Sequence, residues 1–291
     1  MRKFFGPAGS VIRTIVESEF LKSNMLGDPT ARTVDVYLPA GHDGQGLPLL
    51  VDLVGFTGLS ERLMETVVPV LSRYLEETSA AVVAHRGTID KFIGDAVMAF
   101  WGAPKANSEH AADACFAALA AVDRLAMSGS GLRMRVGINT GAVIVGNIGS
   151  SDRLSYTAIG DPVNVASRLE AMNKRYGTQI LIGETTREAA GDAIIVRRLD
   201  RVSVYGRHGG TVIYELLGIG GEPVVPWVQT YEAGLHAYEQ RRWREAIDRF
   251  EETIALKGAD QPSDIMIARC RDLLSHPPAA DWQPIVALDS K

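Results

Sequence analysis

Two aspartates stand alone at the edges of apolar runs, where a carboxylate is costly to bury. Asp52 interrupts the run 49–54 (LLVDLV), and Asp95 follows Gly94 in a tight turn between two short apolar stretches. A charge held that close to a core needs a counter-charge or a bound metal. A glycine near each aspartate lets the backbone approach a ligand closely. Together the two aspartates indicate a divalent-cation and phosphate site.

The stretch after Asp52 adds a second element that could bind phosphate. Residues 55–57 (GFT) turn the chain into a helix-like segment, whose first free N–H groups can hold phosphate oxygens. Two carboxylates beside such a helix start are the components of two-metal phosphoryl chemistry. Each aspartate taken alone is more simply a turn or cap residue. The interpretation therefore depends on the two occurring together.

Four ordered motifs resemble the class III nucleotidyl cyclases, over roughly residues 45–218. Two of them contain the aspartates, namely 51–61 (VDLVGFTGLSE) and 91–98 (KFIGDAVM). The other two are 133–141 (RMRVGINTG) and 156–169 (YTAIGDPVNVASRL). The resemblance implies an α+β fold with a ferredoxin-like cyclase core, and the expected strand–helix–hairpin–helix–strand order agrees with it.

The resemblance implies roles in metal and triphosphate binding for the first two motifs. Asp52 and Asp95 match the residues that hold two Mg²⁺ or Mn²⁺ ions, with help from the backbone carbonyl of Leu53. Phe56 and Thr57 would offer backbone N–H groups to the triphosphate. One ion lowers the pKa of the ribose 3′-hydroxyl that attacks the α-phosphorus, and the other neutralises the departing pyrophosphate.

Lys91 and Thr157 match the pair that selects the purine base in this family. Lys91 can donate to N1 of adenine, and the Thr157 hydroxyl can accept from the 6-amino group. Guanine presents the reverse pattern, and guanylyl members carry Glu and Cys at these positions. The threonine also resembles subclass IIIb. ATP is therefore the expected substrate, although Thr157 is also typical of an ordinary β-strand residue.

Asn164 and Arg168 lie four residues apart, hence on one face of the helix expected to begin at Pro162. They match the family's transition-state pair. Arg168 suits the charge that grows on the α-phosphoryl oxygens, and Asn164 orients the ribose. An Asn and an Arg at this spacing on a helix are usually exposed surface residues without a catalytic role, but the place of this pair in the fourth motif favours catalysis. Arg135 matches a phosphate-contacting arginine, with an exposed strand-start residue as the alternative.

One segment departs from the family pattern. Tyr205 stands where relatives place a lysine that touches the terminal phosphate. Arg207 either replaces that contact or the contact is lost, which would weaken ATP binding without removing the chemistry.

In this family the active site is built across a dimer interface, so the resemblance implies a symmetric homodimer with two sites. For each site, one chain would supply Asp52, Asp95 and Arg135, and the other would supply Lys91, Thr157, Asn164 and Arg168. A monomer should be nearly inactive.

Composition narrows the class of protein. The chain has 291 residues, of which 46% are hydrophobic and 22% charged, as in ordinary globular proteins. Its net charge of −5 argues against a nucleic-acid partner. Neither a membrane span nor a signal peptide is predicted, so we expect a cytoplasmic protein. Cys115 and Cys270 fit reduced core thiols better than a disulfide.

We divide the chain into an N-terminal connecting helix and loop (1–44), a catalytic domain (45–220) and a C-terminal helical tail (221–291). Helical spacing places the connecting helix at 10–26, before a glycine-rich loop at 41–48. Within the catalytic domain we expect strands at 48–54, 132–139, 142–147, 179–182 and near 194–217, a hairpin at 81–101, and helices at about 58–79, 108–127, 162–175 and 184–190.

The tail is predicted to contain an amphipathic helical pair broken at Arg241. Ala246 and Phe250 have the small-then-aromatic spacing of a tetratricopeptide repeat. One repeat cannot bury its own face, so we favour a helical cap on the catalytic domain over a module that binds a protein partner. An extended end follows, which could dock through Trp282.

The leading hypothesis is an adenylate cyclase that converts ATP to 3′,5′-cyclic AMP and pyrophosphate. One alternative is a guanylyl or relaxed-specificity cyclase, and another is a non-catalytic nucleotide-sensing module with a cyclase fold. A diguanylate cyclase shares the ferredoxin-like core, but its Gly-Gly-Asp/Glu-Glu-Phe turn is absent from the sequence.

Overall fold

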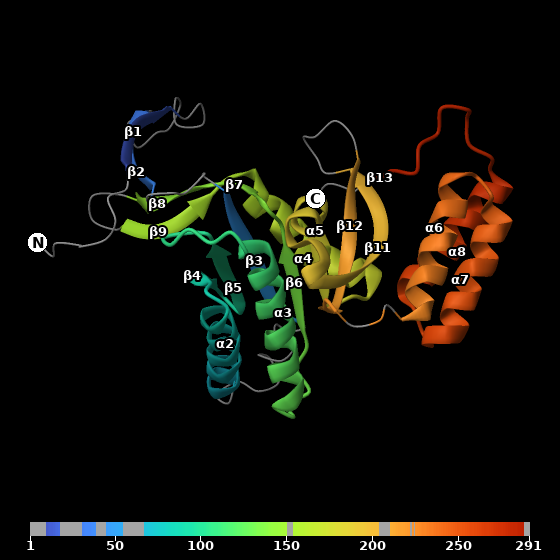
Figure 1. The fold of residues 1–291 in the computed structure, drawn as a ribbon, viewed down its shortest axis with the longest axis horizontal. Coiled ribbons are helices and arrows are strands. Elements are labelled where there is room, and N and C mark those ends of the chain that lie inside the picture. The colour runs from blue at the N-terminus through green and yellow to red at the C-terminus, as the bar shows by residue number, and fades with distance from the viewer. Residues whose placement is uncertain are drawn as a thin grey trace, which may run out of the picture.

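The structure, a computed structural model, describes residues 10–17, 31–38, 45–54, 67–149, 154–203, 210–221, 223 and 225–287. A large mixed sheet forms its centre, with strand order β4-β5-β3-β6-β10-β12-β11-β13 and the short β7 paired to β3. Helices cover both sides of this sheet, and a helical unit stands at its β11 end (Figure 1).

The first half of the sheet has the predicted ferredoxin-like connectivity. Its elements follow the order β3 (Gln45–Leu53), α2 (Val67–Ala84), β4 (Thr88–Ile93), β5 (Ala96–Trp101), α3 (His110–Met127) and β6 (Met134–Ile138). In space the strands lie in the order β4-β5-β3-β6, and every neighbouring pair is antiparallel. Helix α2 crosses from β3 to β4 and α3 from β5 to β6, so the core is a split pair of βαβ units.

The second half extends the sheet beyond β6. Its elements are β7 (Gly141–Ala142), β8 (Ile144–Gly149), β9 (Leu154–Ile159), α4 (Asp161–Tyr176), β10 (Ile180–Gly183), α5 (Glu184–Ala190), a 3₁₀ turn (Gly191–Ala193), β11 (Ile194–Ser203) and β12 (Gly210–Ile219). Strand β10 runs parallel to β6 after the α4 crossover, and β12 and β11 continue the sheet antiparallel. Strands β8 and β9 pair only with each other in the described sheets.

Side chains of the central strands alternate between two cores. Val51, Val97 and Val136 face α2 and α3 and belong to the main hydrophobic cluster. Met98 and Phe100 point to the opposite face, where they pack with residues of the β8–β9 hairpin. Because side chains alternate with a period of two, one face of the sheet packs against α2 and α3, and the other packs against α4 and the β8–β9 hairpin.

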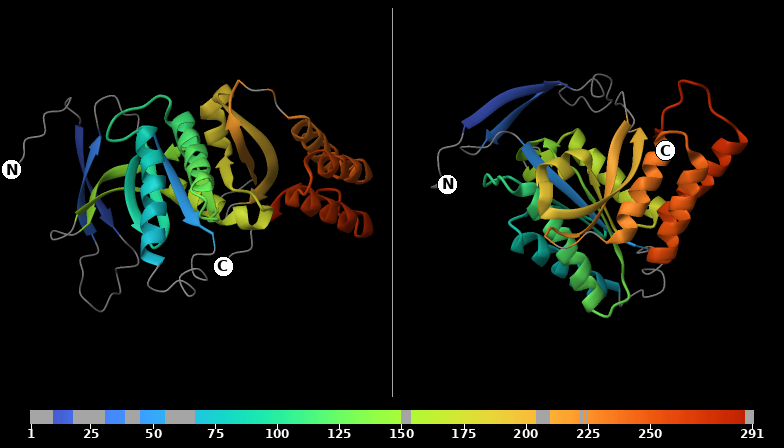
Figure 2. Two further views of the ribbon diagram at one scale, coloured as in Figure 1. Left: turned by 90° about the horizontal axis from the view of Figure 1, so that it is seen from below. Right: turned by 45° about the vertical axis from the view of Figure 1, so that its right-hand side comes forward.

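The N-terminal helix predicted over 10–26 is wrong for its first eight residues. Ser10–Glu17 is strand β1, which pairs antiparallel with β2 (Ala31–Leu38) along its whole length. Val11, Ile12, Ile15 and Val16 are β-branched, so they favour an extended chain once a partner strand is available. The β1–β2 hairpin lies beside β8 (Figures 1 and 2). Residues 18–26 are outside the described ranges.

Other predicted boundaries shift for similar reasons. Helix α2 continues to Ala84, so the hairpin predicted from residue 81 begins at Thr88, because Ala81 and Val82 are buried in the helical core rather than in a strand. Strand β3 begins at Gln45, inside the predicted loop. Strand β9 was not predicted, since it depends on pairing with β8 rather than on an apolar run of its own.

Three helices form the C-terminal tail: α6 (Pro226–Glu239), α7 (Trp243–Lys257) and α8 (Gln261–Ser275). The expected helical pair is present, and α8 adds a helix that was not predicted. One hydrophobic cluster joins Tyr231, Phe250 and Met266 of the tail to Leu199 and Ile213 of the sheet. The tail therefore packs against β11 of the sheet, as expected of a cap (Figure 2). Its tetratricopeptide character and a protein partner stay predictions.

The extended end after α8 docks through Trp282, as predicted. The Trp282 ring meets Tyr238 edge-on at 5.5 Å and Trp243 at 6.1 Å between ring centroids. The guanidinium of Arg241 lies 5.5 Å from the same ring. A short strand, β13 (Val286–Ala287), then joins the sheet beside β11. Both cysteines are buried and free, and no helix in the described ranges has the length and apolar composition needed to cross a membrane.

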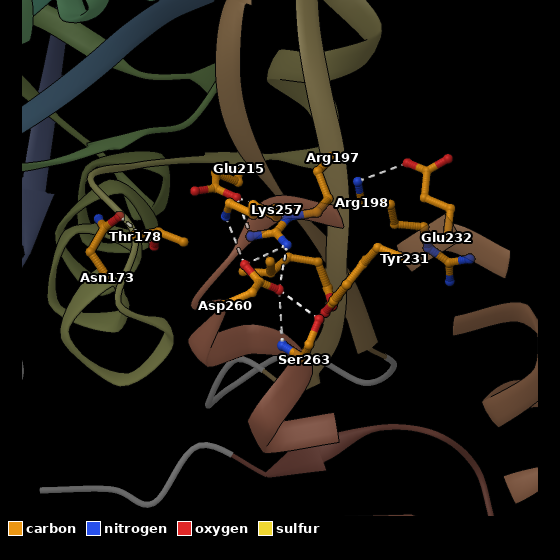
Figure 3. Close-up of polar contacts among 11 residues, drawn as sticks. Asn173, Thr178, Arg197, Arg198, Glu215, Tyr231, Glu232, Lys257, Asp260 and Ser263 are labelled. Carbon is orange, nitrogen blue, oxygen red and sulfur yellow. Dashed lines mark hydrogen bonds and ion pairs between the residues drawn. The ribbon is translucent and has the colours of Figure 1, made fainter. Parts of the chain in front are cut away.

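A buried ion pair joins the tail to the sheet (Figure 3). The guanidinium of Arg197, on β11, is fully buried and lies 2.8 Å from Oδ2 of Asp260. Asp260 also caps α8 by accepting the backbone N–H of Ser263 at 3.1 Å. Burial alone would raise the pKa of Asp260, but the charge of Arg197 and the hydrogen bonds from Arg197, Lys257 and Ser263 together outweigh burial and lower the pKa to about 2. Glu215 holds the other side of Arg197.

We predict that Asp260→Asn destabilises the protein by about 3 kcal/mol, because it leaves a buried guanidinium with Glu215 as its remaining counter-ion. Chemical denaturation would measure the loss, and limited proteolysis would locate it in the tail. The matched control is Glu251→Gln, which removes an exposed pair with Arg271 (3.1 Å) and should cost less than about 1 kcal/mol. Equal stability of Asp260→Asn and the control would contradict this assignment.

The same pair makes a pH-dependent contribution. Because the folded pKa of Asp260 lies below its ordinary value of 3.8, the contribution is complete above that value and disappears as the pH falls toward about 2. The stability difference between the wild-type protein and Asp260→Asn should therefore be constant above about pH 4–5 and shrink below it.

Gly137 allows α4 to pack directly on the backbone of β6. A Cβ at this position would lie 2.0 Å from the carbonyl oxygen of Ala166 and 2.4 Å from the backbone nitrogen of Glu170. Both atoms belong to the α4 backbone, so no side-chain rotation can relieve the overlap. Glycine is therefore required for the close approach of helix and strand.

We predict that Gly137→Ala destabilises the protein by about 1–3 kcal/mol or more, because α4 must move away from the sheet. Gly218→Ala in β12 is the control, since a Cβ there meets nothing within 4 Å. That variant should be unchanged or more stable by up to about 1 kcal/mol. Thermal denaturation of the two variants would separate the effects, and a Gly137→Ala protein as stable as Gly218→Ala would rule out the packing argument.

Candidate active site

Asp52 and Arg135 form the centre of the first group of predicted site residues. They are direct cross-strand partners on β3 and β6, and Oδ2 of Asp52 lies 3.0 Å from Nη2 of Arg135. Nε of Arg135 in turn lies 2.9 Å from Oε1 of Glu170 on α4. Burial raises the pKa of Glu170, and the charge of Asp52 adds to this effect while Arg135 opposes it. One arginine thus bridges two carboxyls on the α4 side of the sheet.

Asp95 joins this group from the turn between β4 and β5. Gly94 has φ +64°, a left-handed conformation that favours glycine and forms the turn. The backbone N–H of Leu53 donates to the Asp95 carboxyl, which brings the turn against the end of β3. Burial raises the pKa of Asp95, and the nearby charge of Asp52 raises it further. Two predicted metal ligands are therefore neighbours, although 43 positions separate them in sequence.

These residues fit a hard divalent cation. Burial and the charge of Asp52 both raise the pKa of Asp95, so a positive ion beside the two carboxyls would favour the ionised form of Asp95. Carboxylate and backbone oxygens are ligands that Mg²⁺ and Mn²⁺ prefer. Within the described ranges, no three His, Cys, Asp or Glu side chains cluster in a way that could hold a metal ion. Mg²⁺ usually takes further ligands from water and substrate phosphates.

A cleft of about 550 Å³ contains the second group of predicted site residues. Lys91 of β4, Thr157 of β9 and Asn164 of α4 line it, together with Met98, Ile148, Ser155, Ala158, Ile159, Gly160 and Val163. Nζ of Lys91 lies 3.0 Å from Oγ1 of Thr157, so the two predicted base-selecting residues contact each other directly. The cleft is mostly apolar with a few polar groups, as expected of a nucleotide-base site.

The start of α4 brings Asn164 to this cleft. Pro162 occupies the first turn of the helix, where its missing N–H costs nothing. Asn164 is exposed and lines the cleft, and Arg168 follows one turn later on the same face, half-buried. Phe56, Thr57, Tyr205 and Arg207 lie outside the described residues, so their predicted roles stay predictions.

Two residues of these groups were missed in the sequence. Asp90 is a fully buried carboxylate that accepts the Thr157 hydroxyl at 2.5 Å. Its signal was present, since it is a charge within the apolar strand 88–93 (TIDKFI) and directly precedes Lys91. Glu170 was missed because a glutamate inside a helix is ordinarily exposed. Only the packing of α4 on Gly137 reveals that this one is buried.

Within one chain the two groups stay apart. None of Asp52, Asp95 and Arg135 lines the cleft that holds Lys91, Thr157 and Asn164. Lys91 points toward β9, whereas Asp95 lies against β3, even though only three residues separate them in sequence. The structure thus places Asp52, Asp95 and Arg135 in one group and Lys91, Thr157 and Asn164 in another, which we call half-sites. That each half-site serves a site shared with a second subunit stays a prediction.

Comparison with known proteins identifies the family of this chain. Residues 48–218 match the family described as adenylate and guanylate cyclase catalytic domain. Adenylate cyclase 1 of Rhizobium meliloti is 45% identical over 198 residues, which are 65% of this chain and 29% of that longer protein. Two solved structures also match: the adenylyl cyclase CyaB from P. aeruginosa (34% identity, TM-score 0.55, 62% of this chain and 97% of that one) and the guanylyl cyclase Cya2 (38%, 0.54, 61% and 93%).

The family match covers more than half of the 291 residues and includes all four sequence motifs. It spans the ferredoxin-like core except the first three residues of β3, together with α4, β10, β11 and most of β12. We conclude that this chain belongs to the family of adenylate and guanylate cyclase catalytic domains.

Proposed function

We propose that the protein is an adenylate cyclase that converts ATP to 3′,5′-cyclic AMP and pyrophosphate. The observation that carries the choice of ATP is the hydrogen bond between Lys91 and Thr157 at the cleft. An ammonium can only donate and a hydroxyl can accept, so together they complement the N1 acceptor and 6-amino donor of adenine. A guanine placed in the same way would present its N1–H donor to Lys91 and its O6 acceptor to Thr157, which this pair does not match.

Each half-site has a defined task in this proposal. Asp52 and Asp95, with the backbone carbonyl of Leu53, would hold two Mg²⁺ or Mn²⁺ ions, which activate the 3′-hydroxyl and neutralise pyrophosphate when bound. Arg135 contacts a phosphate of the substrate. Asn164 orients the ribose, and the guanidinium of Arg168 stabilises negative charge on the α-phosphoryl oxygens in the transition state.

The two half-sites would meet in a homodimer. Phe92 and Ile93 lie between Lys91 and Asp95 in sequence, and they are 51% and 54% exposed. Ile144 and Ile159 of the β8–β9 hairpin are about as exposed, at 49% and 51%. Exposed large apolar side chains beside two incomplete sites favour a second copy of the chain as the partner that covers them. Burying each would stabilise the dimer by up to about 1.5–3 kcal/mol.

The direct test is to incubate the purified protein with Mn²⁺ and either ATP or GTP, and to identify the product by chromatography and mass spectrometry. We expect cyclic AMP from ATP and little cyclic GMP from GTP. A preference for GTP would identify a guanylyl cyclase instead. No product from either nucleotide would favour the non-catalytic nucleotide-sensing module.

We predict that Asp95→Ala lowers kcat by at least about 10²–10³-fold while the protein stays folded. The reason is that the carboxylate binds metal, and its removal also relieves a like-charge contact with Asp52. The Mn²⁺ affinity, measured by calorimetry, should fall in parallel. Asp192→Ala, in the 3₁₀ turn outside both half-sites, is the control and should keep full activity. Retention of a tenth of wild-type activity by Asp95→Ala would refute the metal assignment.

A mixing experiment tests the shared site. Asp95→Ala and Arg168→Ala should each be almost inactive, because every site of either homodimer lacks one component. In an equal mixture with free exchange, half of the dimers are mixed and each has one intact site. We therefore expect activity to recover to roughly a quarter of the wild-type value, from the symmetry of the dimer. If both residues served the same site from one chain, the mixture would stay as inactive as its components.

A further inference from the structure

Asp90 is a buried carboxylate directly behind the two residues proposed to read the purine base. Its side chain is 0% exposed. Oδ2 accepts hydrogen bonds from the hydroxyl of Thr157 at 2.5 Å and from the backbone N–H of Ala158 at 3.2 Å. Oδ1 is buried and has no hydrogen bond within the described part of the chain, but it lies 3.4 Å from Nζ of Lys91. Asp90 therefore contacts both members of the base-selecting pair.

The chemistry of the three groups determines the direction of every hydrogen bond among them. A carboxylate has no proton to give, so the Thr157 hydroxyl must donate to Asp90. An ammonium has no lone pair, so the same hydroxyl must accept from Lys91, which lies 3.0 Å away. A hydroxyl has one proton and two lone pairs. Thr157 is thus left with a single lone pair and no proton for a ligand in the cleft.

Lys91 is constrained in the same way. Its ammonium has three N–H donors, of which one donates to Thr157, while Asp90 holds the ammonium as an ion pair at 3.4 Å. Donors of Lys91 therefore remain for the cleft. The three side chains present the donors of Lys91 and one acceptor, from Thr157.

We propose that Asp90 is a positioning residue that sets purine specificity. It accepts the hydrogen bond that the Thr157 hydroxyl donates, so the Thr157 oxygen can only accept a hydrogen bond from a ligand. A 6-amino group can donate to the remaining lone pair, whereas a 6-oxo group would meet it lone pair to lone pair. Without Asp90 the hydroxyl could rotate and donate to a 6-oxo group as well. This inference rests on the proposed function and adds the reason for its preference for 6-aminopurines.

A purely structural role for Asp90 makes a different prediction. Through Ala158, Asp90 ties β9 to the edge strand β4. Loss of that tie alone would weaken ATP and GTP alike. The ratio of kcat/KM for ATP to that for GTP is therefore the quantity that separates the two roles.

The first test is Asp90→Asn. The ammonium of Lys91 favours the amide oxygen on its own side, so Nδ2 is turned toward Thr157 and donates to its hydroxyl oxygen. The hydroxyl proton is then free for a 6-oxo group. We expect the ATP:GTP ratio to fall by at least about tenfold. Asp113→Asn is the matched control. Asp113, on α3, is also buried and charged, but its partners are Arg86 and Asn107, which lie outside the cleft. The control should keep the wild-type ratio, and an unchanged ratio in folded Asp90→Asn would overturn the inference.

A second variant keeps the inference testable if Asp90→Asn does not fold. Thr157→Val preserves side-chain volume and removes the hydroxyl. If Asp90 holds that hydroxyl as an acceptor, kcat/KM of the variant falls for ATP, which loses a hydrogen bond from its 6-amino group. It does not fall for GTP, because the lone pair that repelled the 6-oxo group is gone. A hydroxyl that could rotate would hydrogen-bond to both nucleotides, so an equal fall of kcat/KM for GTP would overturn the inference. Adding Asp90→Asn to Thr157→Val should not change the ratio further.

Binding measurements separate this inference from the proposed function. 3′-Deoxy-ATP and 3′-deoxy-GTP cannot cyclise, so calorimetry with each of them and Mn²⁺ reports base selection without turnover. Wild-type protein that binds 3′-deoxy-ATP more tightly and loses this preference in Asp90→Asn supports the inference, whether or not the protein is an active cyclase. A wild-type preference for guanine overturns both proposals. A preference for adenine that survives in Asp90→Asn and Thr157→Val overturns only the role of Asp90.

Discussion

The close packing of helix α4 on strand β6 is the constraint on which the candidate site depends. Gly137 lets the helix backbone touch the strand, since any side chain there would overlap with α4 main-chain atoms. Because the helix lies so close to the strand, Glu170 forms an ion pair with Arg135, and Arg135 forms a second ion pair with Asp52 on the next strand. The first turn of the same helix forms one wall of the purine cleft. One backbone contact therefore determines the relative positions of three residues to which we assign roles: Asp52 in metal binding, Arg135 in phosphate binding and Asn164 in orienting the ribose.

Buried charges in this protein are balanced within the chain, and the balance differs between structural and functional sites. The guanidinium of Arg197 is enclosed by carboxylates and by the rings of Trp227 and Tyr231, so no ligand can reach it. At the candidate site the compensation is incomplete. The charge of Asp52 raises the pKa of half-buried Asp95, and Lys91 keeps a donor facing the cleft. A substrate or a metal ion gains the most binding energy at a site where the protein leaves its own charges incompletely compensated.

Much of this was predictable from the sequence, because strand periodicity and ordered motifs are local properties. The ferredoxin-like core and the spacing between Asn164 and Arg168 required no tertiary information. The errors arose where long-range pairing decides the structure. The segment containing Val11 and Ile15 has helical spacing but forms a strand, since a partner strand supplies the hydrogen bonds. Asp90 was missed for a related reason: its neighbour Thr157 is 67 positions away in sequence and meets it only through the contact between β4 and β9.

The division of the candidate site has a consequence for how binding and chemistry are coupled. In the proposed enzyme the purine edge is read by Lys91, Thr157 and Asp90, all of one chain and already in contact with one another. Base selection would then need no partner, and a single subunit would distinguish nucleotides. In the proposed dimer the metal-binding carboxylates come from the other chain. The reaction therefore begins only when a nucleotide whose base is held by one subunit places its phosphates at the carboxylates of the other subunit. Any signal that changes how the two subunits approach each other would then alter turnover more than nucleotide preference.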